Sequence, residues 1–361
     1  MPNNDLAARI RHLVDQRVAL ENQLTNEKGE IPDATSRRYD EQYQSLQRQL
    51  ANLFGEAGQD QDRITIMLEM MRILENRLVY LQNFIVDPSS ENRILAQLVT
   101  KFIDTLSRQK SNVLTTLEAT YYRAVAALYA GDLGKAREGF SAACESEESD
   151  EANDIKYKSY VILGHLSHEG GDYAAAKDLH DQSLRYSQNS NVTAQALALK
   201  ALNAYALQDY DESLHLFGEA LALFSPDQPF FNSYFYRNAL LFCGAIHFDR
   251  RDYPAAEGFY RRVLDSVEQS SYDYFDALSH LGRIYYAQQR FEDAVSAFEK
   301  AVQTHRFGEN EYVVDTWFWL ARCHLKRSDS PEARRYLEKI AATDVRYDKK
   351  PQAVELLQRI A

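Results

Sequence analysis

Few side chains in this sequence have the type and spacing needed for chemistry, and they are scattered. His165 and His168 are three residues apart with Glu169 beside them, so a helix would place both imidazoles on one face. Such a pair binds a metal only if a third ligand arrives from elsewhere, and solvent-facing or groove-lining histidines are the simpler interpretation. His180 falls where a recurring pattern otherwise places aromatic residues, which favours a packed ring. We therefore expect no metal site.

The acidic run from Glu145 to Glu151 is the other candidate ion site. It contains five carboxylates but lacks the alternating ligand spacing and the turn glycine of a calcium loop, which favours a solvated loop. The sequence has no glycine-rich phosphate loop, no metal-binding pair of cysteines and no nucleophile elbow. These observations predict a protein with no catalytic residues and no cofactor, one that is not an enzyme.

Composition narrows the possible partners and compartments. The 361 residues are 45% hydrophobic and carry a formal net charge of -12, which disfavours binding to nucleic acid or to anionic membranes. Three cysteines, widely spaced and odd in number, suit buried thiols in a reducing compartment, so we expect a cytoplasmic location. No run approaches 18 apolar residues and the first residues are polar, so neither membrane insertion nor a signal peptide is expected.

The first 110 residues show helical seams without repeats. Apolar residues recur at alternating spacings of three and four, interrupted once by Arg17. The seams run over residues 6–24, 39–53 and 64–85, and a fourth helix is expected around 94–102. Gly29 and Pro32 should break the first pair into an antiparallel hairpin, and residues 54–62 resemble a hinge. Two interpretations stay open: a self-contained helical bundle, or a coiled-coil stalk through which residues 6–53 form a homo-oligomer or dock a partner.

After residue 112 one motif recurs six times. The segments are GDLGKAREGFSAA (131–143), GDYAAAKDLHDQS (171–183), QDYDESLHLFGEA (208–220), RDYPAAEGFYRRV (251–263), QRFEDAVSAFEKA (289–301) and SDSPEARRYLEKI (328–340), which align without gaps. Each has a small residue at its sixth position and, except at His180 and Leu337, an aromatic residue four positions later. A second small residue lies upstream of each segment, at Ala124, Gly164, Ala201, Gly244, Gly282 and Ala321.

This pattern resembles the tetratricopeptide repeat (TPR), a pair of helices, A and B, that cross closely at those small residues. Trp317 and the aromatic residues Tyr173, Tyr210, Tyr253 and Phe291 also fall on family positions. The resemblance implies an all-α superhelical solenoid of six repeats over residues 111–346, preceded by a helical module (1–110) and closed by a capping helix (347–361). The units are 37 to 43 residues long and lack the family's closing proline, as in longer kinesin-light-chain-type arrays.

The resemblance also implies a function. TPR arrays bind peptides or domains in the groove lined by helix A, so the chain is expected to be a protein-interaction scaffold or adaptor. The alternative is a TPR-framed regulator that acts on nucleic acid or on an enzyme partner. Carried onto this sequence, the family's groove positions give Tyr121, Val125, Lys158, His165, His168, Tyr205, Phe248, Arg283, Tyr286, Phe318, Arg322 and Lys326.

The last five of these residues predict a basic, aromatic-lined surface near the C-terminus. Arginines there would bind carboxylates of an acidic segment while the rings bury an apolar anchor. An equally weighted alternative is that the arginines pair internally with acids such as Asp276 and Asp315.

Overall fold

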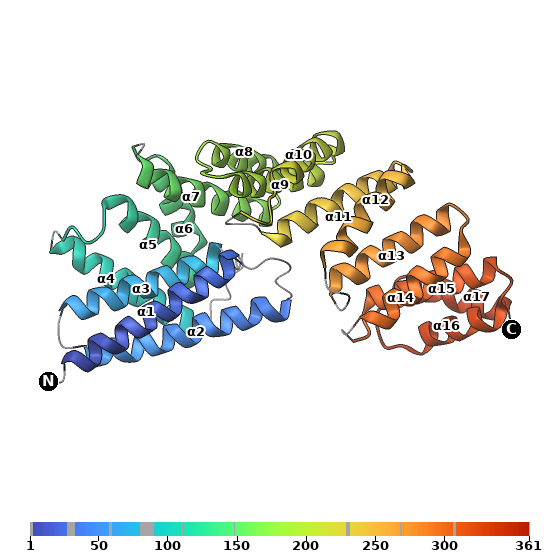
Figure 1. Ribbon diagram of the computed structural model, residues 1–361, viewed down its shortest axis with the longest axis horizontal. Helices are drawn as coiled ribbons and strands as arrows, with labels where there is room; N and C mark the ends of the chain where they lie inside the picture. Colours follow the sequence, from blue (N-terminus) through green and yellow to red (C-terminus); the bar gives the residue numbers. More distant parts are fainter. Residues whose placement is uncertain are drawn as a thin grey trace. The chain divides into compact units, whose positions relative to one another are not determined.

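The computed structural model describes residues 3–26, 33–57, 60–79, 90–109, 111–147, 149–228, 232–267, 269, 271–305 and 308–360. Over these residues the chain forms seventeen helices and no strand (Figure 1). The predicted all-α class is therefore confirmed. Two compact units divide between Asn232 and Ser233, the first holding α1 to α10 and the second α11 to α17. The predicted domain boundaries at residues 110 and 346 stay predictions.

In the first unit the helices are α1 (Asn3–Asn26), α2 (Asp33–Glu56), α3 (Asp60–Val79), α4 (Ser90–Arg108), α5 (Thr116–Ala130), α6 (Leu133–Cys144), α7 (Asp150–Glu169), α8 (Tyr173–Leu184), α9 (Ser190–Ala206) and α10 (Tyr210–Leu223). In the second unit they are α11 (Ser233–Asp249), α12 (Tyr253–Ser266), α13 (Tyr272–Ala287), α14 (Phe291–Thr304), α15 (Glu311–Lys326), α16 (Ser330–Ala342) and α17 (Lys350–Arg359). The pairs α5/α6 to α15/α16 are the six predicted repeats. In each unit, consecutive helices pack side by side (Figure 1).

The predicted hairpin of the first two helices is confirmed by an ion pair that joins the start of α1 to the end of α2. Arg9 at the start of α1 lies 2.7 Å from Glu56 at the end of α2, which requires antiparallel helices. The expected break at Gly29 and Pro32 lies outside the described residues, as does the last part of the third seam, residues 80–85. The expected hinge at 54–62 is shorter than predicted, because α2 continues to Glu56 and α3 begins at Asp60.

Arg17, which interrupts the first seam, is buried inside the bundle with a matching charge. Its Nε donates to Glu69 of α3 at 2.6 Å, and Glu69 also accepts from Arg72 at 2.8 Å. Arg17 and Glu69 are 7% and 4% exposed. A buried ion pair adds little net stability, but losing one partner would leave a charge uncompensated. The pair therefore fixes the register of α1 on α3.

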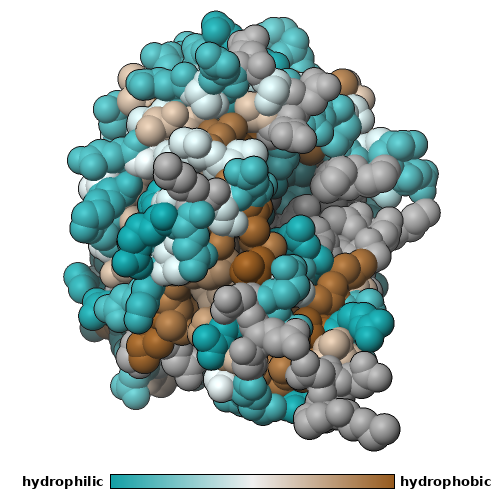
Figure 2. All heavy atoms as spheres, turned by 90° about the vertical axis from the view of Figure 1, so that its left-hand side faces the viewer, coloured by the Kyte–Doolittle hydropathy of each residue, from teal (hydrophilic) through white to brown (hydrophobic). Residues whose placement is uncertain are grey.

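Over its described side chains, the apolar stripe of α1 packs within the chain. Ile10, Leu13 and Leu20 are each no more than 5% exposed and belong to one core with residues of α2, α3 and α4. The prediction that residues 6–53 mediate association rested on the need to cover this stripe, and it stays a prediction. On the face shown in Figure 2, hydrophobic side chains form separate groups among hydrophilic ones.

Helices A and B of each repeat cross at the predicted small residues. The helix-B positions are completely buried in all six repeats, at Ala136, Ala176, Ser213, Ala256, Ala294 and Ala333. In repeats 4 and 5, the ring that lies four residues after the small residue of helix B packs against the small residue of helix A. A Cβ built on Gly282 would lie 2.6 Å from the ring of Phe298, and one built on Gly244 would lie 2.8 Å from the ring of Tyr260. The large ring of helix B therefore occupies the space that the missing side chain of helix A leaves.

The A-to-B corner has the same backbone geometry in every repeat. In each repeat, the residue just before the N-cap of helix B adopts a left-handed conformation with φ between 61° and 81°. These residues are Gly131, Gly171, Gln208, Arg251, Gln289 and Ser328. The next residue is an aspartate that caps helix B in five repeats; in the fifth it is Arg290, whose side chain makes no capping hydrogen bond. Four of the six left-handed residues are not glycine, although such a φ costs other residues about 1 to 2 kcal/mol.

Gln289→Gly should therefore raise the free energy of unfolding by about 0.5 to 1 kcal/mol, because relief of the left-handed strain exceeds the entropic cost of glycine. Its neighbour is the matched control: Gln288 has a φ of -80°, so Gln288→Gly should lower stability by about 0.5 to 1 kcal/mol. Urea unfolding of the second unit measures the stability of both variants. Equal effects of the two changes would contradict the assigned corner.

Within the described residues, no helix is both long enough and apolar enough to cross a membrane. At the C-terminal end, α17 packs on α16, where Ala353 is completely buried and Arg334 donates to the carbonyl of Ile360 at 2.6 Å.

Candidate functional site

In the first two repeats, helix A is already in contact with α3. The hydroxyls of Tyr121 and Tyr122 donate to Glu75 at 3.4 and 3.0 Å, and the ammonium of Lys158 lies 2.7 Å from the same carboxylate. Burial alone would lower the pKa of Lys158, but the charges of Glu75 and Asp154 raise it above its ordinary value. Tyr121 is 1% exposed. The predicted groove residues Tyr121 and Lys158 therefore contact Glu75, an acidic residue of the same chain.

Four other predicted groove residues close the corner between helices A and B. The last turn of helix A contacts the first residue of helix B, with ring centroids 5.1 to 5.9 Å apart. These contacts join His168 to Tyr173, Tyr205 to Tyr210, Phe248 to Tyr253 and Tyr286 to Phe291. Packing therefore accounts for most of this aromatic series.

The histidines near repeat 2 form a hydrogen-bonded group. Asn203 bonds His168 Nδ1 at 2.8 Å through its amide oxygen and His180 Nδ1 at 2.9 Å through its amide nitrogen. Burial lowers the pKa of His180 to about 3, so the ring is neutral. His165 lies 3.7 Å from Glu169. Among the described residues no group of three His, Cys, Asp or Glu side chains could hold a metal ion.

In the second unit, Asp315 of α15 gathers donors from three elements. Its carboxylate accepts from Arg283 of α13, from Tyr347 at 2.7 Å, from Lys349 at 2.6 Å and from Trp319 Nε1 at 3.1 Å. Burial would raise the pKa of Asp315, but hydrogen bonds and charge from Lys349 and Arg283 bring it below its ordinary value. Arg283 is thus paired internally with one of the two acids foreseen as its alternative partners. The segment between α16 and α17 joins the site through Tyr347 and Lys349.

Arg322 lies beside this centre without an acidic partner. Its guanidinium carbon is 4.6 Å from the ring centroid of Trp319, 4.9 Å from Tyr286 and 5.9 Å from Phe318. No described residue forms an ion pair with Arg322 or with Lys326, which follows it by four residues on α15. The rings hold the guanidinium in place by cation-π contact and leave its donors available.

We call Tyr286, Trp319, Arg322, Lys326 and Lys349 the aromatic-basic patch. Three of its members were predicted from sequence, while Trp319 and Lys349 were not. Phe318 was predicted at the surface but is 1% exposed and packs against Tyr347. Trp319, the next residue, is half-buried and contacts Tyr286 with the ring centroids 5.2 Å apart. Binding by the predicted groove residues stays a prediction.

Comparison with known proteins supports the repeat assignment. A family model described as tetratricopeptide repeat matches residues 235–306 and 273–344, which span α11 to α16. No curated protein matches the sequence.

Solved structures resemble the fold at low sequence identity. The apo form of the quorum sensor NprR from B. thuringiensis has a TM-score of 0.54 at 17% identity, over 80% of this chain and 79% of that one. BtubC from P. vanneervenii has a TM-score of 0.50 at 15% identity, over 68% and 93%. A signal-transduction ATPase with a tetratricopeptide repeat sensor from Pyrococcus horikoshii has 0.56 at 13%, over 88% and 49%. Residues 235–344 therefore match the tetratricopeptide repeat, and the solved structures extend the likeness in fold, without close sequence similarity, over more of the chain.

Proposed function

We propose that this protein is a non-catalytic interaction scaffold that binds an acidic segment of a partner protein at the aromatic-basic patch. The observation that carries the proposal is Arg322, a guanidinium fixed over three rings with no described acid to neutralise it. Such a cation is pre-organised for a carboxylate, because little side-chain freedom remains to be lost on binding.

The rest of the patch defines the ligand further. Trp319 and Tyr286 are half-buried and offer a surface for one apolar or aromatic side chain. Lys326 and Lys349 are exposed and add positive charge on a chain whose net charge is -12. The expected ligand is a segment with two or more carboxylates around a single apolar anchor. Buried aromatic anchors and arginines supply most of the energy at such interfaces.

Arg322→Gln should weaken binding of this ligand class about tenfold, because it removes the charge while keeping a similar polar side chain. The probe is a fluorescein-labelled peptide of about ten residues with glutamates flanking one phenylalanine, followed by fluorescence anisotropy. A second peptide, with glutamine in place of glutamate, tests whether the carboxylates are needed.

Arg335→Gln is the matched control, because the Arg335 guanidinium also lies over a ring, 4.4 Å from the centroid of Tyr336, but on α16. It should leave the affinity unchanged, and both variants should melt within a few degrees of wild type. Equal affinity for the two peptides, or an equal loss in both variants, would contradict the proposal.

A further inference from the structure

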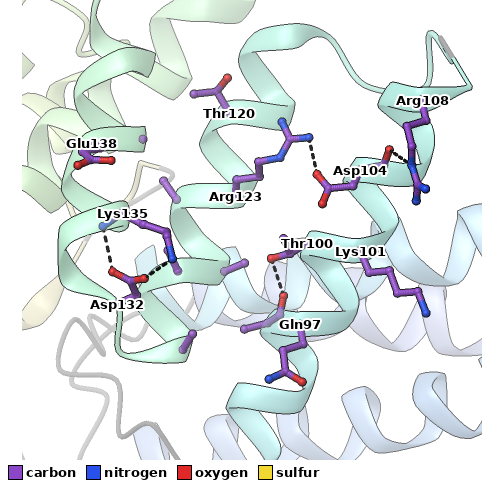
Figure 3. Close-up of a pocket in the computed structure, with 16 residues that line it drawn as sticks. Gln97, Thr100, Lys101, Asp104, Arg108, Thr120, Arg123, Asp132, Lys135 and Glu138 are labelled. Carbon is purple, nitrogen blue, oxygen red and sulfur yellow. Dashed lines mark hydrogen bonds and ion pairs between the residues drawn. The ribbon is translucent and has the colours of Figure 1, made fainter.

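The first unit contains a hollow between α4 and α6, with α5 as its floor (Figure 3). Its volume is about 690 Å³. Small side chains line it: Ala124, Ala126, Ala127 and Ala130 on α5, with Ala96 on α4 and Gly139 on α6. The two walls are polar: Figure 3 shows Arg123 of α5 reaching Asp104 of α4, and Lys135 folded back onto Asp132 at the start of α6. The hollow is distinct from the aromatic-basic patch, which belongs to the other unit.

The equivalent space is filled in other repeats. In the aligned segments, Gly139 corresponds to Leu179, Leu216, Phe259, Ala297 and Tyr336. Counted from the small residue of helix A, Ala127 corresponds to Ser167, Ala204, His247, Tyr285 and His324. Rings stack across these two positions in repeats 4 and 6, with centroids 5.5 Å apart for His247 and Phe259 and 5.9 Å for His324 and Tyr336. The first repeat has alanine and glycine there, so the space lies open.

Gly139 cannot be enlarged to fill this space without moving its neighbour. A Cβ built on it would lie 2.7 Å from the Cβ of Ala124, because α5 and α6 approach closely at this point. The close approach of the helices therefore requires glycine, and the depth of the hollow follows from it.

The two walls differ in charge. On α4, Lys101 has no ion-pair partner among the described residues, and the guanidinium of Arg108 bonds only the carbonyl of Asp104 and the hydroxyl of Thr105. On α6, Lys135 is paired with Asp132 at 2.8 Å, and Glu138 is near enough to Lys135 to raise its pKa but forms no ion pair with a described residue. Counting the described residues, the α4 wall thus carries two positive charges without an ion pair, and Asp132, Lys135 and Glu138 together give the α6 wall one net negative charge.

We propose that this hollow receives a partner helix that inserts one large apolar side chain over Ala127 and Gly139 and turns an acidic flank toward Lys101 and Arg108. Helices pack at 8 to 10 Å when the contact residues are small, which suits a floor of alanine and glycine. The inserted side chain replaces the ring pair that fills this space in repeats 4 and 6. The charge difference between the walls sets the orientation of the bound helix.

The first test needs no partner and asks whether the space is open. Ala127→Phe should leave the melting temperature of the full chain unchanged or raise it, because the ring enters the hollow. Ala204→Phe is the matched control, since Ala204 is the equivalent residue of repeat 3, is completely buried, and has Leu216 rather than glycine as its aligned partner on helix B. It should lower the melting temperature by several degrees through overpacking. If Ala127→Phe destabilises the protein as much as Ala204→Phe, the hollow is not a receptor and the proposal is overturned.

The second test uses a defined helix as probe: an alanine-based peptide of about 16 residues with one central phenylalanine and glutamates along one flank. Calorimetry should show binding to the wild type, weakened at least about tenfold in Ala127→Phe. Lys101→Glu combined with Arg108→Glu should reverse the preference toward a peptide with lysines on that flank. No binding of the acidic peptide, or an unchanged preference in the charge-reversed variant, would overturn the proposal.

Discussion

Gly282→Leu should lower the free energy of unfolding of the second unit by about 3 kcal/mol, near the upper end of what overpacking costs. Gly282 lies on α13, where even a Cβ would meet three atoms of the Phe298 ring at 2.6 to 2.7 Å. Phe298 is completely buried, so its ring cannot move out into solvent without disturbing its neighbours. The two helices must therefore separate, which disturbs the packing of α14 against α15 as well.

The control for this change is Gly258→Leu on α12. Nothing lies within 4 Å of a Cβ built at Gly258, which is exposed. Leucine has a better helix propensity than glycine, so this variant should be as stable as the wild type or more stable by up to about 1 kcal/mol. Urea unfolding followed by circular dichroism measures both. Similar stability of the two variants would show that the repeats cross elsewhere than at Gly282.

His180→Phe should make the protein markedly less sensitive to acid. Four of the other repeats have an aromatic ring at this position, as in Phe140 and Phe298, so the fold accepts the change. Burial and the nearby His165 charge lower the pKa of His180 to about 3, whereas an unfolded histidine titrates near 6.5. Between these values the unfolded chain binds the extra proton. The stability of the wild type therefore falls as the pH drops below about 6.5, by up to about 1.4 kcal/mol per pH unit from this residue.

The measurement is the difference in unfolding free energy between wild type and His180→Phe at several pH values. At pH 7 the difference should be about 1 kcal/mol or less, reflecting the lost hydrogen bond to Asn203. At pH 5 and below, the variant should be the more stable protein. His280, whose pKa burial also lowers to about 3, is present in both proteins and cancels in the difference. A difference that does not change with pH would mean that His180 is not buried in the neutral form.

The repeat architecture could be predicted because its signals are redundant. Six copies of a small residue followed by a bulky one fix the register of helix B, and all six small residues are completely buried. The same alignment located the helix pairs although the units are longer than usual. The N-terminal seams also predicted helices, because a strict spacing of three and four residues places apolar side chains on one face.

Surface positions on helix A were harder to predict, because a shift of one residue turns a side chain by about 100° around the helix. Helix A is covered on two sides in a stacked array and exposes only a narrow strip. Phe318 was placed on that strip, but the structure buries it and leaves the next residue, Trp319, only half-buried. Trp319 follows Asp315 by four residues, so a search for partners of that acid along the helix could have found it.

Three further features had no sequence signal to reveal them. Lys349 reaches Asp315 from a segment between helices, where no repeat register applies. The left-handed residues at four corners are glutamine, arginine, glutamine and serine, although local preference favours glycine there. The packing of the two helices outweighs that local preference. Packing between helices cannot be predicted from the few residues around the corner. Likewise, the acid that contacts Lys158 comes from α3, far away in the chain.

The most direct test of the aromatic-basic patch uses the only two tryptophans of the chain, Trp317 and Trp319. Their indole N-H groups give two separate signals in a nuclear magnetic resonance spectrum of protein with labelled tryptophan. Trp319 donates to Asp315 at the patch, whereas Trp317 is 6% exposed with Lys339 over its ring. Titration with the acidic phenylalanine peptide should shift the Trp319 signal progressively and leave that of Trp317 in place. Binding of the peptide with an unmoved Trp319 signal would contradict the proposed site.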